Sequence, residues 1–192
     1  MNLLAHLWLA DRSATSPAGQ ILGDIVKGRL AENETRFSAA IDQGIRLHRR
    51  IDSHCDDHWI HRDLRRRFEP PLRRYAGIIV DIGLDHALAR RWADFSEEPL
   101  SAFARRAGNL IEAEWPENAP DSAPDAVGLS RLITGYAEPV GIERALRSVG
   151  HRLRRRNPLA DSLPALLREY HAFERGLPTL LAALEQTVGV RS

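Results

Sequence analysis

Apolar residues recur at helical spacing along most of the chain, and this pattern predicts an all-α fold. The sequence shows no pair of alternating strands bounded by hairpin signals. Ser16-Pro17 is typical of a helix start, and Pro70-Pro71 is typical of a firm break. The pattern predicts helices over residues 2–12, 17–26, 35–56, 57–68, 72–94, 99–115 and 161–187.

Prolines mark two places in the second half of the chain where the helical pattern is interrupted. The stretch from Pro116 to Pro124 holds three prolines and several acids, so we expect an exposed loop. Two or three helices should finish the chain, with Pro164 and Pro178 interrupting or kinking the last one. We find no internal repeat and no low-complexity tract. We therefore expect one compact helical domain spanning residues 1–192.

The composition excludes several classes of protein. Hydrophobic residues make up 43% of the chain, which fits a folded globule and argues against disorder. The formal net charge of +1 gives no sign of a nucleic-acid partner. Cys55 is the only cysteine, so an intrachain disulfide is impossible and a reducing compartment fits. No apolar stretch approaches the roughly 20 residues that span a membrane. We expect a cytoplasmic protein.

Two polar residues lie on the apolar face of the helix predicted over residues 35–56. His48 and Asp52 are four residues apart and share that face with Ile45 and Ile51. Because burial of an isolated charge is costly, the Asp52 carboxylate must be paired, hydrogen-bonded or bound to a metal. The alternative to a functional role is a structural His48–Asp52 pair or a salt bridge to an arginine.

The most apolar predicted helix repeats this pattern. Asp81 and Asp85 lie one turn apart on an apolar face, and His86 directly follows Asp85. Two carboxylates at this spacing repel each other unless a cation lies beside them. The cation could be an arginine such as Arg46 or Arg90. Finding the same pattern on two helices favours a functional site instead.

Another histidine and another acid lie upstream. His6 is flanked by leucines and should be buried, where it could also be a core histidine bonded to backbone or to a carboxylate. Asp24 lies among apolar residues near the end of its helix, where it could instead be a cap. The mixture of imidazole and carboxylate suits Mn²⁺, Fe²⁺ or Zn²⁺ better than Ca²⁺. The candidate set is His6, Asp24, His48, Asp52, Asp81, Asp85 and His86.

A second group of histidines has the spacing of a zinc site. His54, His58 and His61 share one helical face, but charged neighbours surround them, so we expect surface histidines, of which one or two could reach the mouth of the site. The sequence contains no GxSxG, Walker A or GxGxxG motif and no Cys–His nucleophile arrangement. A metal-activated water is therefore favoured over a covalent mechanism.

Four stretches resemble a known family. They are NLLAHLWLA (residues 2–10), GQILGDIVKG (19–28), GIRLHRRIDSHCD (44–56) and RRYAGIIVDIGLDHALARRW (73–92). In this order and spacing they resemble the acyl carrier protein phosphodiesterase family, whose members look like divergent HD-type metal phosphohydrolases. The resemblance implies an HD-like helical fold and a divalent cation, foremost Mn²⁺, with Fe²⁺, Mg²⁺ or Zn²⁺ as alternatives. It also implies hydrolysis of holo-acyl carrier protein to apo-acyl carrier protein and 4′-phosphopantetheine, a reaction of lipid metabolism and fatty acid biosynthesis.

Within this hypothesis each side chain receives a role. The expected metal ligands are His6, Asp24, His48, Asp85 and His86, and the expected catalytic residues are Asp24, His48, Asp52 and Asp81. Asp52 is suited to orient the His48 imidazole, and Arg49 is the candidate contact for the substrate phosphate. Carrier proteins are acidic, so a basic docking surface is expected. We favour the run Arg62, Arg65, Arg66, Arg67, Arg73 and Arg74 over a second run, Arg152, Arg154, Arg155 and Arg156.

Two other functions stay open at this stage. One is an HD-like phosphohydrolase acting on a nucleotide or another small phosphodiester. The other is a non-catalytic helical binding module whose buried acids pair with arginine. Assays on carrier protein and nucleotides would separate the two enzymes, and stoichiometric metal would argue against the binding module. The sequence leaves the oligomeric state open.

Overall fold

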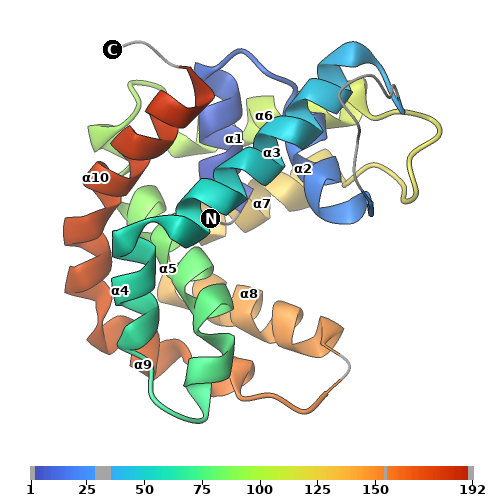
Figure 1. The fold of residues 1–192 in the computed structure, drawn as a ribbon. Helices are drawn as coiled ribbons and strands as arrows, with labels where there is room; N and C mark the ends of the chain where they lie inside the picture. The colour runs from blue at the N-terminus through green and yellow to red at the C-terminus, as the bar shows by residue number, and fades with distance from the viewer. Residues whose placement is uncertain (1–2, 29–35, 154, 190–192) are drawn as a thin grey trace.

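The computed structural model describes residues 3–28, 36–153 and 155–189, and these residues form helices and loops without a strand (Figure 1). This confirms the all-α prediction. The predicted helix starts at residues 2 and 35, and Arg154 of the second basic run, lie outside the described residues. The helices are α1 (Leu3–Arg12), α2 (Pro17–Ile25), α3 (Ala39–Asp57), α4 (Trp59–Arg66), α5 (Ala76–Arg90), α6 (Leu100–Glu114), α7 (Ala126–Gly135), α8 (Pro139–Arg152), α9 (Leu163–Arg168) and α10 (Tyr170–Val188), with 3₁₀ turns η1 (Leu72–Tyr75), η2 (Trp92–Asp94) and η3 (Leu159–Asp161).

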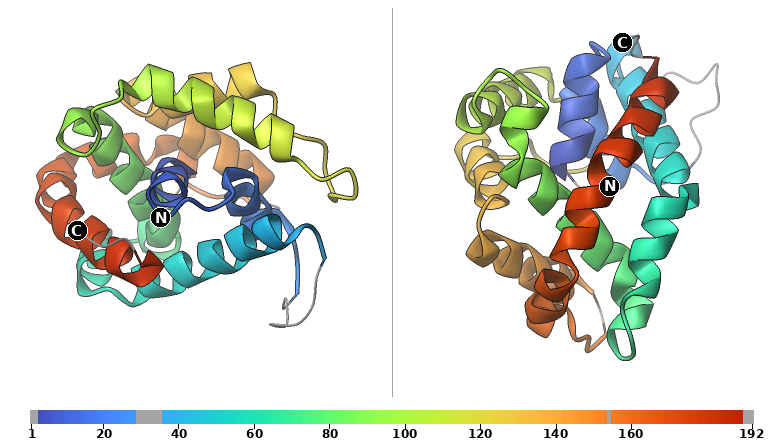
Figure 2. Two further views of the ribbon diagram at one scale, coloured as in Figure 1. Left: turned by 90° about the horizontal axis from the view of Figure 1, so that it is seen from above. Right: turned by 90° about the vertical axis from the view of Figure 1, so that its left-hand side faces the viewer.

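Helix α1 lies in the middle of the molecule. Seen from above in Figure 2, α3, α6 and α10 surround it, and α5 lies beside it. Every residue from Leu4 to Ala10 is buried, including His6. A helix that is packed on all sides is apolar all round, which explains the unbroken apolar sequence of this segment. A histidine at such a position must find its hydrogen-bond partners inside the protein.

Helices α2 and α3 touch along their backbones. A Cβ atom added to Gly19 would lie 2.7 Å from the Gly44 Cα atom, closer than real Cβ contacts allow. Only glycine at both positions permits this approach. The Ser16 side chain accepts a hydrogen bond from the Gly19 backbone N–H at 3.0 Å and caps α2, as the sequence predicts. This contact between the two helices brings the end of α2 against the middle of α3.

The long helix predicted over residues 72–94 is divided in the structure. The α-helical part is α5, preceded by η1 and followed by η2. The Trp92 indole N–H donates to the Glu98 carbonyl oxygen, and the Arg91 guanidinium pairs with the Asp94 carboxylate at 2.7 Å. These contacts stabilise a turn after Arg90, where periodicity alone predicts more helix.

The structure confirms the loop predicted from prolines, but not every predicted interruption of the last helix. Residues 116–124 form the loop between α6 and α7 as predicted. Pro164 lies in the first turn of α9, whereas Pro178 lies inside α10 without ending it. No helix among the described residues is both long enough and apolar enough to cross a membrane.

Candidate active site

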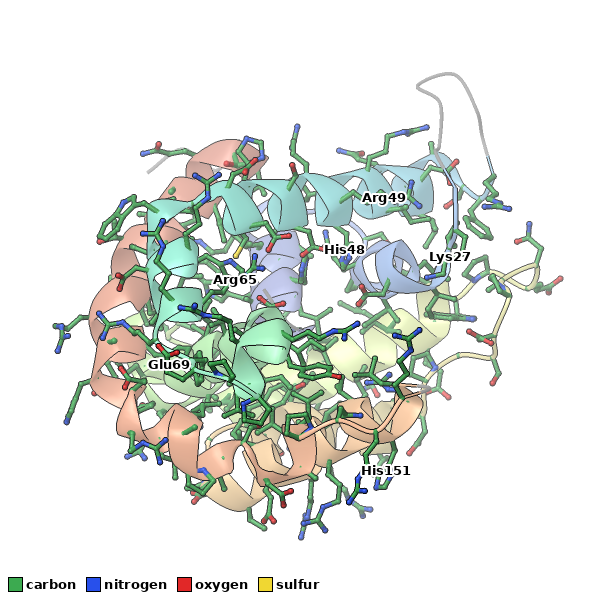
Figure 3. All side chains as sticks on the ribbon, turned by 60° about the horizontal axis from the view of Figure 1, so that its bottom comes forward. Lys27, His48, Arg49, Arg65, Glu69 and His151 are labelled. Carbon is green, nitrogen blue, oxygen red and sulfur yellow. The ribbon has the colours of Figure 1, made fainter. Side chains whose placement is uncertain are left out.

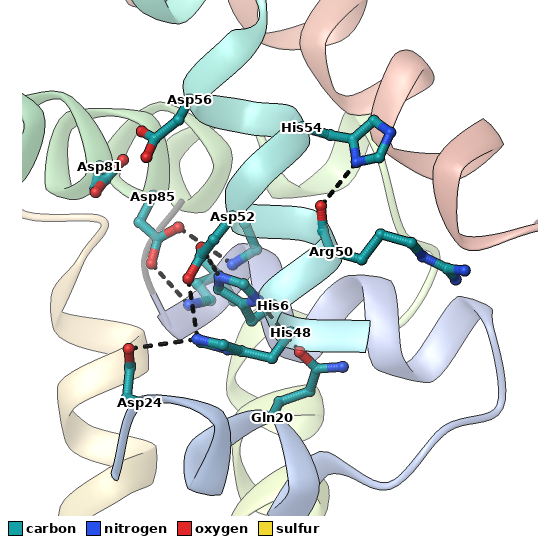
Figure 4. A network of polar contacts seen from close by, with 12 residues as sticks. His6, Gln20, Asp24, His48, Arg50, Asp52, His54, Asp56, Asp81 and Asp85 are labelled. Atoms are coloured by element: carbon teal, nitrogen blue, oxygen red, sulfur yellow. Dashed lines mark hydrogen bonds and ion pairs between the residues drawn. The ribbon is translucent and has the colours of Figure 1, made fainter. Parts of the chain in front are cut away.

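Three predicted residues meet between α1 and α3. The Asp52 carboxylate lies between two imidazoles, with Oδ1 2.9 Å from the His6 Nε2 atom and Oδ2 3.0 Å from the His48 Nε2 atom (Figure 4). The two imidazole rings stack with their centroids 4.1 Å apart. His6 and His48 are buried, and the Asp52 side chain is 40% exposed, so the cluster opens to solvent on the carboxylate side.

Asp24 joins the cluster from the end of α2. Its Oδ1 atom lies 3.3 Å from the His48 Nε2 atom, and its side chain is exposed. The preceding residue, Gly23, makes this approach possible because a Cβ atom there would lie 2.6 Å from the His48 Cβ atom and closer still to the ring. The backbone of α2 therefore lies directly against the His48 side chain.

Both nitrogen atoms of the His6 ring face an oxygen atom of another side chain. Burial lowers the pKa of His6, so its ring is neutral near pH 7. The His6 Nδ1 atom lies 3.2 Å from the Gln20 Oε1 atom, which can only accept a hydrogen bond. A neutral imidazole has one N–H, which donates either from Nδ1 to Gln20 or from Nε2 to Asp52, 2.9 Å away. When the proton is on Nδ1, the Nε2 lone pair is free to bind a cation beside the Asp52 carboxylate.

The electrostatics of His48 show that this cluster favours positive charge. Burial opposes protonation of His48, but hydrogen bonds to Asp24 and Asp52 outweigh it and raise the pKa to about 9. Burial also acts against ionisation of Asp52, yet the bonds to His48 and His6 hold the pKa of that carboxyl well below its usual range. Two carboxylates around one imidazole thus attract positive charge, and a proton occupies a position that a metal ion could take.

The donor set fits a divalent transition metal. One donor atom each from His6, His48 and Asp52 lie within 4.8 Å of one another. Neighbouring donor atoms around a cation with bonds of about 2.1 Å lie about 3.0–3.4 Å apart, close to the distances found here. Gln20 bonded to the far nitrogen of His6 is the arrangement that fixes a ligating imidazole. The cluster with its imidazole and carboxylate donors suits Mn²⁺, Fe²⁺ or Zn²⁺.

Asp85 lies at the N-terminus of α1. Its carboxylate accepts the backbone N–H of Leu4 at 2.7 Å and that of Ala5 at 3.1 Å. Burial raises the pKa of Asp85 to about 7, although the two backbone hydrogen bonds act in the opposite direction. A carboxylate at a helix N-terminus satisfies donors that the helix leaves unpaired. Asp85 thereby holds the start of the helix that carries His6.

Substitution of Asp85 by alanine should therefore destabilise the protein strongly. Each buried N–H left without a partner costs about 1–3 kcal/mol, so we expect a loss of about 2–5 kcal/mol in the free energy of unfolding. Asp125 is a matched control because it caps α7 through the backbone N–H groups of Val127 and Gly128 but is exposed. Asp125→Ala should cost about 1 kcal/mol. Equal losses for the two variants in urea unfolding would contradict this role.

His86 points away from the cluster. Its Nδ1 atom lies 2.6 Å from the Tyr136 carbonyl oxygen, and its ring lies 5.1 Å from the Tyr170 ring. The structure therefore does not bring His86 to the donor atoms of His6 and His48. Position 86 follows Asp85 on a helix, so the two side chains point about 100° apart.

The arginines predicted to bind the substrate either bind another group of the protein or are exposed to solvent. The Arg49 guanidinium donates to the Val26 carbonyl oxygen at 2.8 Å and stabilises the end of α2, beside Lys27 (Figure 3). Arg73 and Arg74 are exposed on η1, and Arg73 lies 3.9 Å from the Glu69 carboxylate. None of these contacts places an arginine on the Asp52 carboxylate.

The prediction that His54, His58 and His61 are surface histidines is wrong for one of them. His54 is exposed and His58 half-buried, but His61 is fully buried, with its Nε2 atom 3.1 Å from the Asp81 Oδ1 atom. Asp81 thus has His61 as its partner. Helix α4 packs against α5, which removes from solvent the face that carries His61. Of the charged neighbours in the sequence, Asp57 and Arg62 are exposed and pair with each other, whereas Asp56 lies 3.5 Å from the His61 Nδ1 atom.

Sequence reasoning missed Gln20 and Gly23. Gln20 is buried and bonds to His6, and it precedes Asp24 by four residues, so the two share one face of α2. Two polar residues at this spacing on an otherwise apolar helix could have indicated that Gln20 belongs to the same site as Asp24. The need for glycine at position 23 depends on the packing of α2 on His48, which no local pattern indicates.

Comparison with known proteins agrees with the resemblance of the four stretches. The model of the family described as "Acyl carrier protein phosphodiesterase" matches residues 1–184. A protein of that name from Enterobacter sp. (strain 638) is 36% identical over 182 residues, which cover 91% of this chain and 90% of the relative. One from Klebsiella pneumoniae (strain 342) is 35% identical with the same coverage of both chains. No solved structure matches the chain. The predicted family is confirmed: this chain belongs to the acyl carrier protein phosphodiesterase family.

Proposed function

We propose that this protein is a metal-dependent phosphodiesterase that removes 4′-phosphopantetheine from holo-acyl carrier protein and leaves apo-acyl carrier protein. Family membership supports the reaction class, because the matching relatives are named for it. The observation that carries the metal dependence is the His6 Nε2 atom facing the Asp52 carboxylate while Nδ1 faces the Gln20 oxygen. The bond to be broken joins the phosphate to the serine oxygen of the carrier protein.

The residues of the cluster would have different roles in such a site. His6, His48 and Asp52 would hold the cation, with Asp24 as a further ligand from the exposed side. A bound divalent cation supplies charge that polarises the phosphoryl oxygen and lowers the pKa of the attacking water. Gln20 orients the His6 ring through Nδ1. Asp24, the most exposed of these side chains, is placed to accept a proton from water at the site mouth.

A direct assay tests the proposal together with metal removal. Purified protein is incubated with holo-acyl carrier protein and Mn²⁺, and mass spectrometry follows the loss of the phosphopantetheine group. After chelation and dialysis we expect no loss of the group, and addition of Mn²⁺ should restore it. A parallel panel of nucleotides and small phosphodiesters tests the alternative substrate class. Full activity of the metal-free protein would contradict the metal dependence, and activity on nucleotides alone would contradict the carrier-protein substrate.

We also propose that the basic side chains of α4 and η1 form the carrier-protein docking surface. Arg65, Arg66 and Arg74 are exposed and make no ion pair within the part of the chain that the structure describes. Arg62 and Arg67, by contrast, pair with Asp57 and Asp63. The unpaired arginines are therefore available to an acidic partner.

Charge reversal at this surface should weaken carrier binding. For the double variant Arg65→Glu/Arg74→Glu we expect KM to rise about 10-fold or more at low salt, and the difference from wild type to shrink at high salt. The matched control is Arg155→Glu/Arg156→Glu, which reverses two exposed charges of the second run. Titration of KM against salt for both variants checks the expectation. A larger rise in KM for the control variant would mean that the second run, and not the first, forms the docking surface.

A further inference from the structure

A second group of donor atoms lies one helical turn away from the His6–His48–Asp52 cluster. It consists of the Cys55 Sγ atom on α3, one nitrogen of His61 on α4 and a carboxylate oxygen of Asp81 on α5, which lie within 4.8 Å of one another. Cys55 and His61 are fully buried, and the Asp81 side chain is 32% exposed. Cys55 follows Asp52 by three residues, so both clusters lie along the same side of α3.

The His61 ring is held between two carboxylates. Its Nε2 atom lies 3.1 Å from the Asp81 Oδ1 atom, and its Nδ1 atom lies 3.5 Å from the Asp56 Oδ1 atom. Nδ1 is buried and has no hydrogen bond among the described residues. Figure 4 shows where Asp56 and Asp81 lie relative to the first cluster, beyond Asp52 and Asp85. An imidazole whose two nitrogens both face carboxylates can carry its proton on Nδ1, toward Asp56, and leave Nε2 to a cation.

We propose that Cys55, His61 and Asp81 form a second metal site that takes Zn²⁺ or a similar soft transition-metal ion. His61 would ligate through Nε2, and its Nδ1–H would then turn toward Asp56, the carboxylate–histidine–metal arrangement of zinc sites. Donor atoms around tetrahedral zinc lie about 3.3–3.8 Å apart, so side-chain movements of about 1 Å complete the site. A water molecule would complete the coordination, and the exposed Asp56 side chain leaves an entry path from solvent.

The chemistry of the donors separates this site from the first one. A thiolate favours Zn²⁺ over Mn²⁺, whereas the first cluster offers only imidazole and carboxylate. Burial raises the pKa of the Cys55 thiol to about 11, so the thiol is protonated in the metal-free protein. Metal binding forms the sulfur–metal bond and releases the Cys55 proton to solvent. The three ligands come from α3, α4 and α5, so the bound ion would tie these helices together.

Cobalt provides a spectroscopic test that does not depend on enzymatic activity. Metal-free protein is titrated with Co²⁺, and the near-ultraviolet charge-transfer absorption from thiolate to cobalt is recorded. We expect the band to reach its maximum when one Co²⁺ ion per protein is bound at the site with Cys55. Added Zn²⁺ should displace this Co²⁺ and remove the band. Cys55→Ser should lack the band, and His61→Gln should show weaker binding by at least 10-fold. Absence of the band in the wild-type protein would overturn the proposal.

Two further variants separate the second site from the first. His48→Ala, which disrupts only the first cluster, should keep the cobalt–thiolate band. His54→Gln is the control for a histidine of α3 that is exposed and bonds to the Arg50 carbonyl oxygen, and it should also keep the band. Zinc should raise the Tm of His48→Ala by several degrees and leave that of His48→Ala/Cys55→Ser unchanged. Equal zinc-induced shifts in these two proteins would contradict the site even if the phosphodiesterase proposal holds.

Discussion

Replacement of Asp52 by asparagine should abolish metal binding and lower kcat/KM by about 10²–10⁴-fold while the fold is retained. The two Asp52 oxygens face the Nε2 atoms of His6 and His48, and asparagine keeps the shape but removes the charge and one acceptor. The amide nitrogen cannot bind a cation, so the variant offers a metal ion one neutral oxygen in place of a charged carboxylate.

The measurement for Asp52→Asn combines metal content with steady-state kinetics on holo-acyl carrier protein. Asp57→Asn is a suitable control because Asp57 ends the same helix, is exposed and pairs only with Arg62 among the described residues. We expect the control to keep wild-type metal content and to change kcat/KM by less than about 2-fold. Stoichiometric metal and full activity in Asp52→Asn would reject the assignment of the site.

Gly23→Ala should disrupt the site, although Gly23 contributes no side chain to it. The new Cβ atom would lie 2.6 Å from the His48 Cβ atom and closer to the imidazole ring. The His48 ring cannot turn aside because it is buried and stacked on His6. Overpacking of this kind costs about 1–3 kcal/mol, and a shift of the ring by 1 Å is expected to lower activity by about 100-fold.

Gly77→Ala provides the matched control for Gly23→Ala. Gly77 lies in the first turn of α5, and a Cβ atom there would meet no other atom within 4 Å. Alanine should stabilise that helix by about 0.5–1 kcal/mol because glycine is a poor helix former. Urea unfolding and kcat/KM would be measured for both variants. Loss of activity in Gly77→Ala, or none in Gly23→Ala, would contradict the packing argument.

The arrangement of the site explains why it uses residues from three helices. Close contact of Gly19 with Gly44 brings α2 onto α3, which places Asp24 beside His48. Asp85 fixes the start of α1, which places His6 opposite Asp52. Stability and function are therefore linked at these positions, because a loosened helix contact also moves a donor atom.

The sequence by itself determined the first six helices and the central pair of the site, whereas the two or three helices expected for the rest of the chain are four among the described residues, α7 to α10. Periodicity indicated every α-helix from α1 to α6, and Ser16-Pro17 marked the start of α2. His48 and Asp52 could be paired from their spacing because residues four apart on a helix are neighbours whatever surrounds them. The end of α5 could not be placed in this way, since contacts of Trp92 and Arg91 decide it.

Only the tertiary structure decided which partner each remaining polar residue found. Asp85 and His86 are adjacent in sequence, yet one contacts the backbone of α1 and the other the Tyr136 carbonyl oxygen. His61 looked like a surface residue and is buried against Asp81. The physical reason is that helix periodicity defines a face, whereas packing defines what lies opposite that face. Local spacing therefore fixed which side chains could meet within α3, and the contacts between α1, α2, α4 and α5 fixed the rest.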